Sequence, residues 1–195
     1  TTACRNGCAS RLVCRPKTRR LSRPCRKHWA NGSGAQRVLK KVTIFGVGLI
    51  GGSFALALKQ AGAVVQITGV GRRTATLERA LALGIIDVAS TSLADAVPDA
   101  DLILIATPVA QTAALLAAIK PYLSAHTIVT DAGSTKTDVV AAARLGLAEK
   151  IHQFVPGHPI AGREQNGPDA ALADLYVGKK VVLTALPENL PATVE

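Results

Sequence analysis

At 195 residues the chain is long enough for one domain with a good-sized hydrophobic core. Its net charge of +10 does not belong to that domain: residues 1–40 carry 11 Lys/Arg and no Asp/Glu, whereas residues 41–195 carry 12 Lys/Arg and 13 Asp/Glu. We therefore expect no nucleic acid partner for the domain and, since no uncharged apolar run reaches about 18 residues and no signal peptide is recognisable, a cytoplasmic protein that spans no membrane.

The N-terminal segment, residues 1–37, is expected to be an unstructured, disordered basic extension. It holds all four cysteines of the chain, but their spacing includes no C-x-x-C pair, so we expect no metal site. An Arg-rich, acid-free segment is typical of an organelle transit peptide, which would make the protein organellar. The alternative, which we favour, is foreign or mistranslated sequence. The chain also contains no methionine, which indicates an incomplete reading frame.

The domain, expected over residues 38–187, opens with an apolar, β-branched strand that runs into a Gly-x-Gly-x-x-Gly turn and then a helix. Gly46 allows the tight turn, Gly48 lets the backbone approach a pyrophosphate, and Gly51 lets the helix pack closely on the strand. The pyrophosphate would bind the free N–H groups at the helix N-terminus. The turn therefore predicts a dinucleotide site, whose residues are Gly46, Gly48, Leu49, Ile50 and Gly51.

A second strand, expected over residues 64–70, ends at Gly71, Arg72 and Arg73. Enzymes that use NAD usually place an Asp or Glu about 20 residues beyond the glycine turn, where it binds the ribose 2′-hydroxyl. Here two arginines stand at that distance, and guanidinium groups bind a 2′-phosphate that a carboxylate would repel. We therefore expect NADP in preference to NAD. The alternative is that the arginines are only the exposed start of a helix.

The rest of the chain alternates helices and strands, which predicts an α/β fold: a Rossmann-type, doubly wound, mostly parallel sheet. The almost purely apolar strand at 102–106 is expected at its centre and the strand at 85–88 at an edge. Thr74 and Ser92 are expected to be N-caps, and Gly84 a C-cap. The expected helices span residues 54–62, 74–83, 93–97, 109–119 and 137–148; the remaining expected strands span residues 127–130 and 180–184.

Ligands of such a sheet bind at the carboxyl ends of its strands, so the residues that follow each strand are site candidates. Thr107 and Pro108 follow the central strand and are assigned to the cofactor. Ser134 precedes a helix, where it either donates to a substrate or cofactor oxygen or acts as an ordinary N-cap. His158 stands before a proline that keeps its backbone extended, so its imidazole can take a proton from a carbinol while hydride leaves.

Four segments in this order resemble the nucleotide-binding domain of the prephenate/arogenate dehydrogenases (TyrA family) of tyrosine biosynthesis. They are Gly46–Ser53, Thr107–Val109, Asp131–Lys136 and Gly157–Glu164, of which the last two are the most specific. The resemblance covers roughly residues 38–187 and implies oxidative decarboxylation of prephenate or arogenate with NAD(P)+. Hydride would pass from the ring carbinol carbon to the cofactor, and loss of carbon dioxide would aromatise the ring.

The resemblance also implies roles for three side chains. His158 would hydrogen-bond and deprotonate the ring hydroxyl, Ser134 would bind that hydroxyl or orient His158, and Glu164 would help to shape the substrate pocket. The family carries a second, helical domain that forms a homodimer and closes over the substrate. We expect residues 188–195 to begin a linker to such a domain, absent here, which puts turnover by this fragment alone in question.

Three alternatives remain open at the level of function. One, nucleic-acid binding by residues 1–40, would be weak and salt-sensitive, because Trp29 is their only aromatic residue for stacking. The other two concern the domain. The first is an NADP-binding module without independent catalysis. The second is another Rossmann dehydrogenase that acts on β-hydroxy acids, but it offers no reason for the His-Pro-Ile-Ala-Gly segment that begins at His158.

Overall fold

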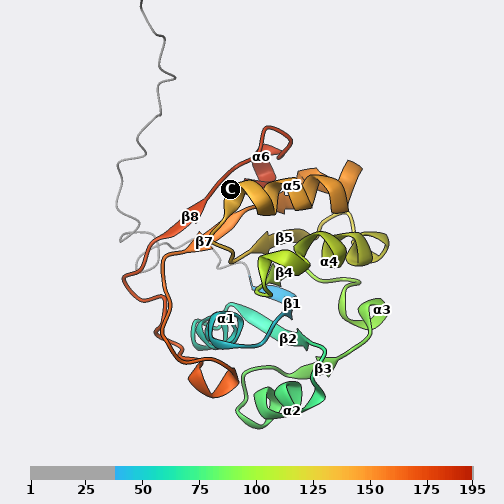
Figure 1. Ribbon diagram of the computed structural model, residues 1–195. Helices are drawn as coiled ribbons and strands as arrows, with labels where there is room; N and C mark the ends of the chain where they lie inside the picture. The colour runs from blue at the N-terminus through green and yellow to red at the C-terminus, as the bar shows by residue number, and fades with distance from the viewer. Residues whose placement is uncertain (1–37, 195) are drawn as a thin grey trace, which may run out of the picture. The chain divides into compact units, whose positions relative to one another are not determined.

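The strand pattern produces the expected parallel sheet. In the computed structural model, which describes residues 38–194, six strands pair in the order β3-β2-β1-β4-β5-β6, all in parallel (Figure 1). Their bounds are Leu39–Phe45 (β1), Val64–Val70 (β2), Val88–Ser90 (β3), Leu102–Ile105 (β4), Ile128–Asp131 (β5) and Phe154–Val155 (β6). The strand order reverses between β1 and β4, so the Rossmann-type, doubly wound prediction is confirmed. The extension expected over residues 1–37 lies outside the described residues.

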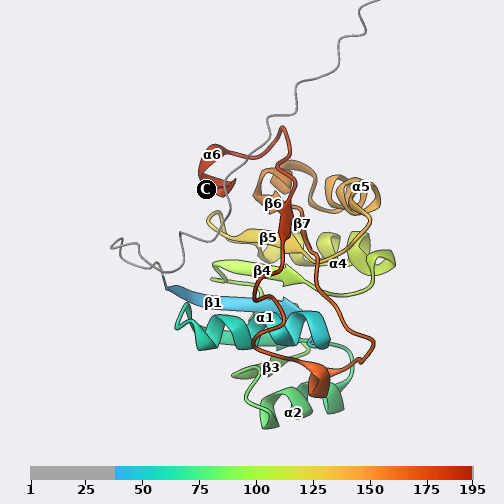
Figure 2. The ribbon, with the colours of Figure 1, turned by 90° about the vertical axis from the view of Figure 1, so that its left-hand side faces the viewer.

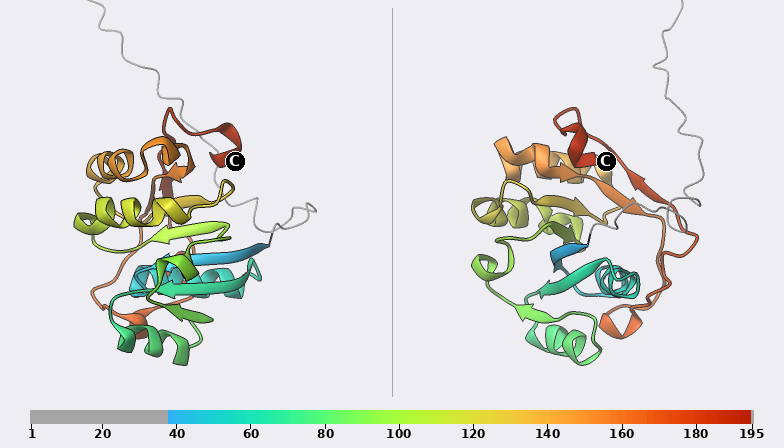
Figure 3. Two further views of the ribbon diagram at one scale, coloured as in Figure 1. Left: turned by 90° about the vertical axis from the view of Figure 1, so that its right-hand side faces the viewer. Right: turned by 180° about the vertical axis from the view of Figure 1, so that it is seen from behind.

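Helices cover both faces of the sheet, because alternate side chains of each buried strand point to opposite faces. Ile44 packs with residues of α1 and α2 in one core cluster. Its chain neighbour Phe45 packs with residues of α3, α4 and α5 in the other. Figures 2 and 3 show helices on both sides of the sheet. The helices span Leu49–Gln60 (α1), Thr74–Ala82 (α2), Leu93–Ala96 (α3), Thr112–Ile119 (α4), Lys136–Leu147 (α5) and Pro191–Val194 (α6).

Several expected boundaries are wrong. The edge strand β3 begins at Val88 because Ile85 and Ile86, each 2% exposed, are buried in the core as a loop. The N-cap of α2 is Arg73 and not Thr74, and the C-cap is Leu83, followed by Gly84 at φ +67°. The helix expected over 109–119 is divided into a 3₁₀ turn, η2 (Val109–Gln111), and α4.

A second, two-stranded antiparallel sheet carries the histidine segment. Strand β7 (Gly157–Pro159) pairs with β8 (Val181–Leu183), with His158 opposite Val182. Between them residues 160–180, which we call the strap, run past α1 to α2 and return (Figure 2). The strap includes a 3₁₀ turn, η5 (Pro168–Ala170), and was not predicted from the sequence.

Hydrogen bonds hold the strap against the first two helices. Ser53 Oγ, which is fully buried in α1, accepts the Leu172 N–H at 2.9 Å. The Tyr176 hydroxyl donates to the Ile50 carbonyl oxygen at 2.8 Å. Within residues 38–194, no helix is long and apolar enough to cross a membrane.

Candidate active site

A cavity of about 910 Å³ opens at the carboxyl ends of β1, β2 and β4. It lies where the strand order reverses, the position at which doubly wound sheets bind their ligands. Six of the ten residues predicted for the cofactor line it: Gly46, Gly71, Arg72, Arg73, Thr107 and Pro108. The other four, Gly48, Leu49, Ile50 and Gly51, belong to the adjoining turn and the start of α1 but do not line the cavity.

The three glycines of the turn differ in how much space surrounds them. A Cβ on Gly46 would lie 2.6 Å from the Ala106 carbonyl oxygen, and its φ of +93° favours glycine. A Cβ on Gly51 would overlap the Gly46 carbonyl oxygen. A Cβ on Gly48 would meet no atom within 4 Å. The protein itself therefore requires the first and third glycines, whereas the second leaves open space beside the turn.

The start of α1 is suited to a bound anion. Its N-cap is Gly48, whose residue type offers no side-chain cap, and its first turn contains no acidic residue. The first N–H groups of a helix have no intrahelical partner, and they carry the positive end of the helix dipole. Within residues 38–194, no side chain caps these donors in competition with a phosphate group. The turn therefore fits the pyrophosphate of a dinucleotide.

One orphaned hydroxyl also fits a bound cofactor. Among the described residues, Thr107 Oγ1 is the buried side-chain oxygen without a hydrogen-bond partner, and Thr107 lines the cavity. Buried polar atoms are nearly always hydrogen-bonded, so an unpaired one at a cavity wall calls for an external partner. A ligand hydroxyl or amide at this position would satisfy it.

The wall of the cavity carries positive charge without negative charge. Arg72 and Arg73 are both exposed at the end of β2. No Asp or Glu is among the described residues that line the cavity. The sequence pattern missed several other lining residues, because Thr91 follows the misplaced strand β3, and Leu93, Gln111 and Leu115 lie in helices or turns without a motif.

The predicted catalytic residues do not line this cavity. Ser134 follows β5 and His158 follows β6. Ser134 is exposed in the loop between β5 and α5, and His158 is half-buried on β7. The N-cap of α5 is Thr135, so the reading of Ser134 as an N-cap is wrong. Glu164 is exposed in the strap. No hydrogen bond joins any two of these three side chains in the part of the chain that the structure describes.

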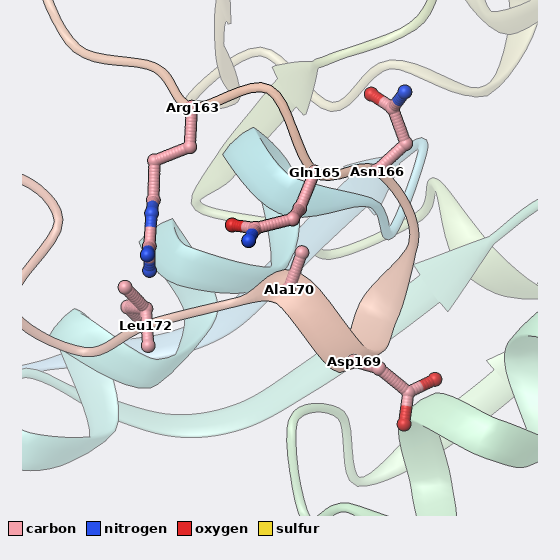
Figure 4. Close-up of a pocket in the computed structure, with 6 residues that line it drawn as sticks. All are labelled: Arg163, Gln165, Asn166, Asp169, Ala170 and Leu172. Atoms are coloured by element: carbon pink, nitrogen blue, oxygen red, sulfur yellow. The ribbon is translucent and has the colours of Figure 1, made fainter.

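The strap has a smaller cavity of its own, about 390 Å³, and of the residues that line it only Arg163 belongs to a motif segment, Gly157–Glu164. Figure 4 shows the Arg163 side chain reaching towards Leu172, with Asp169 pointing away on the other side. Asp169 is already engaged by Arg79, whose Nε donates to Oδ1 at 2.8 Å. This hydrogen bond and the positive charge of Arg79 lower the pKa of Asp169. The remaining lining residues are Gln165, Asn166 and Ala170.

Tyr176 should make the free energy of unfolding of the domain decrease at alkaline pH. Burial raises the pKa of Tyr176 to about 12, whereas tyrosine in an unfolded chain titrates near about 10. Its contribution is therefore complete below about pH 10 and is lost as the pH rises towards 12. Urea unfolding between pH 9 and 12 should show this loss in the wild type and not in Tyr176→Phe. Tyr122→Phe, at an exposed tyrosine, is the control and should behave like the wild type.

Known proteins resemble the chain over most of the described region. Residues 54–193 match the family model of the prephenate dehydrogenase nucleotide-binding domain. The cyclohexadienyl dehydrogenase of Zymomonas mobilis is 38% identical over 147 residues, which are 75% of this chain and 50% of that protein. The prephenate dehydrogenase of Bacillus subtilis is 38% identical over 144 residues, 73% of this chain and 38% of that protein. The chain thus spans half or less of these curated relatives.

Solved structures give the same result. The prephenate dehydrogenase of Aquifex aeolicus in complex with hydroxyphenyl propionate and NAD+ superimposes with a TM-score of 0.73 at 35% identity, covering 80% of this chain and 54% of that one. The arogenate dehydrogenase of Synechocystis has a TM-score of 0.71 at 32% identity, covering 79% of this chain and 53% of that one. The family match extends over most of the large cavity and the His158 segment. The chain therefore belongs to the prephenate dehydrogenase family, and the part that the structure describes is a nucleotide-binding domain of that family.

Proposed function

We propose that the protein takes part in the oxidative decarboxylation of prephenate or arogenate with NAD(P)+ in tyrosine biosynthesis. The observation that carries the proposal is that one family match, residues 54–193, includes both most of the residues that line the cavity and the histidine segment. Its relatives include a cyclohexadienyl, a prephenate and an arogenate dehydrogenase, so both substrates stay in the proposal. A dehydrogenase for β-hydroxy acids has no such support.

The chemistry divides between the cofactor and the protein. The nicotinamide, when bound, accepts the hydride that leaves the ring carbinol carbon. His158 accepts the proton of the ring hydroxyl, and carbon dioxide leaves with the electron pair staying in the ring, which becomes aromatic. Ser134 either donates to that hydroxyl or orients His158, and Glu164 contributes to the substrate pocket. The exposure of Ser134 and Glu164 leaves both side chains accessible to a substrate.

For the cofactor we propose NADP in preference to NAD. Arg72 and Arg73 line the cavity, and its described lining contains no carboxylate that would repel a 2′-phosphate. A charge-assisted hydrogen bond contributes about 1.5–3 kcal/mol, so Arg72→Ala should weaken NADP+ binding by about 10-fold to 100-fold. Binding of NAD+ should change much less. Arg163→Ala, which removes an exposed arginine from the strap, is the control.

Calorimetric titration of both dinucleotides into each variant measures this preference. Tighter binding of NAD+ than of NADP+ by the wild type, unaffected by Arg72→Ala, would contradict it. The solved relative from Aquifex aeolicus holds NAD+, so NAD+ must be titrated beside NADP+.

A second candidate function is an NADP-binding module without independent catalysis. The observation in its favour is that His158, Ser134 and Glu164 do not line the large cavity. The chain also spans only half of the Zymomonas enzyme. In this case the chain would bind dinucleotide but would not turn over substrate by itself.

Two enzyme forms separate these candidates. One is the chain itself, and the other is the chain continued by the C-terminal half of the Zymomonas mobilis enzyme. Each is assayed with prephenate and arogenate, NAD+ and NADP+, by absorbance of the reduced cofactor. Turnover only by the chimera supports the module reading for this chain. If the chimera unfolds cooperatively and binds dinucleotide but oxidises neither substrate, the proposed reaction is wrong.

The proposal also covers macromolecular partners. We expect the whole protein to form a homodimer and the domain to bind no nucleic acid, since residues 41–195 carry 12 Lys/Arg against 13 Asp/Glu. Gel filtration with light scattering and a filter-binding assay test the two statements.

A further inference from the structure

The Asp-x-Gly-Ser-x-Lys segment contains a buried ion pair to which the proposed reaction assigns no role. The Asp131 side chain is 2% exposed and the Lys136 side chain 19% exposed, and Lys136 Nζ lies 2.5 Å from Asp131 Oδ2. Replacing a buried ion pair by packed apolar side chains is often neutral or stabilising, so stability alone is a weak reason for having one. The geometry around the pair indicates a more specific role.

Both members of the pair hold the same residue, Gly157. Asp131 Oδ1 accepts the Gly157 N–H at 3.1 Å, and the Lys136 ammonium donates to the Gly157 carbonyl oxygen. A Cβ on Gly157 would lie 2.8 Å from the Asp131 carbonyl oxygen, so only glycine permits this approach. The pair therefore hydrogen-bonds to both the N–H and the C=O of Gly157, next to the end of β5.

These two hydrogen bonds to Gly157 are the last that join the backbone to the main sheet before His158. The parallel ladder between β5 and β6 ends at Val155, and the next residue is Pro156, which has no N–H to donate. Among the described strands, β7 pairs with β8 alone, and the three residues of β8 are all exposed. The position of the His158 backbone relative to the cavity thus depends on how firmly Gly157 is held.

We propose that Asp131 and Lys136 are positioning residues that hold the His158 imidazole where it can reach the substrate hydroxyl. The inference rests on the proposed function, in which His158 is the base. Lys136 touches neither cavity and acts through the Gly157 peptide. A displacement of about 1 Å in a catalytic group can cost about 100-fold in rate, so loosening this peptide has a large kinetic effect.

The test is a double-mutant cycle in whichever form turns over, the chain or the chimera. Lys136→Met should lower kcat by about 100-fold and leave the KM for the dinucleotide within about threefold. In a His158→Ala background the same change should cost less than about threefold, because there is no imidazole left to position. If the two losses multiply in full, Lys136 acts independently of His158 and the inference is wrong.

A control and a second variant separate positioning from folding. Lys150 also ties two segments together, donating to the Lys120 and Leu123 carbonyl oxygens at 3.0 Å and 2.9 Å, but it lies before the amino end of β6, whereas Gly157 follows the carboxyl end of that strand. Lys150→Met should keep kcat within about threefold of the wild type. Asp131→Asn/Lys136→Met leaves no uncompensated buried charge, so it should fold and still lose the rate.

Amide hydrogen exchange in this chain gives a readout that does not need turnover. Exchange at Gly157 should quicken by at least about tenfold in Asp131→Asn/Lys136→Met and stay unchanged in Lys150→Met. If His158→Ala turns over like the wild type, the base assignment of the proposed function fails, and the exchange result still decides whether the pair holds Gly157. Unchanged exchange at Gly157, or a wild-type kcat in Lys136→Met, would overturn the inference.

Discussion

Replacing His158 by alanine is expected to lower kcat by about 100-fold to 10,000-fold, which is the usual contribution of a positioned general base. The dinucleotide Kd should not change, because His158 does not line the large cavity. The loss should therefore appear in kcat and in kcat/KM for the substrate. Stopped-flow measurement of reduced cofactor, together with a separate binding titration, measures both quantities.

Another histidine of the domain provides the matched control. The His126 side chain is 57% exposed and lies 3.9 Å from Asp101. It precedes β5 and is far along the chain from the histidine segment. His126→Ala should keep wild-type kinetics. A His158→Ala enzyme with wild-type kcat, or an equal loss in both variants, would remove His158 from the mechanism.

Replacing Gly48 by alanine is expected to weaken dinucleotide binding by roughly 100-fold and to leave the fold intact. The new methyl group would meet no protein atom within 4 Å, so it costs nothing in packing. It would stand in the space through which the pyrophosphate approaches the N-terminus of α1. Loss of two charge-assisted hydrogen bonds of about 1.5 kcal/mol each weakens binding by roughly 100-fold.

Gly51, in the same turn, serves as the comparison, because its replacement should lower stability whereas that of Gly48 should not. A methyl group on Gly51 would overlap the Gly46 carbonyl oxygen, so Gly51→Ala should lower the free energy of unfolding by about 1–3 kcal/mol. Gly48→Ala should unfold at the wild-type urea midpoint. If Gly48→Ala binds NADP+ with wild-type affinity while remaining folded, the turn is not the pyrophosphate site.

The elements predicted most accurately are those whose pattern is local. The strand at 64–70 was expected with its observed bounds, since β-branched residues fill it and glycines bound it. The strand at 102–106 is indeed central, because an apolar run of this kind suits only a position buried on both sides. Errors arose where the core competes with local propensity, as at Ile85, whose burial displaces β3.

The candidate site was predicted in part. Six cofactor residues that follow strand ends do line the cavity, because strand ends in a parallel sheet converge on one edge. The catalytic assignments of His158, Ser134 and Glu164 remain predictions. The strap and the role of Lys136 were not predicted from the local sequence. No contact between Lys136 and Asp131 was expected either.

By itself, the sequence determined the doubly wound sheet and the glycine turn, because hydrophobic periodicity and the conformational freedom of glycine act within a few residues. Only the tertiary structure decided what the motif residues touch. Lys136 reaches Gly157 across 21 positions of sequence, and Tyr176 reaches Ile50 across 126. Such contacts depend on where the completed sheet brings distant segments together, and this arrangement sets which groups surround the histidine.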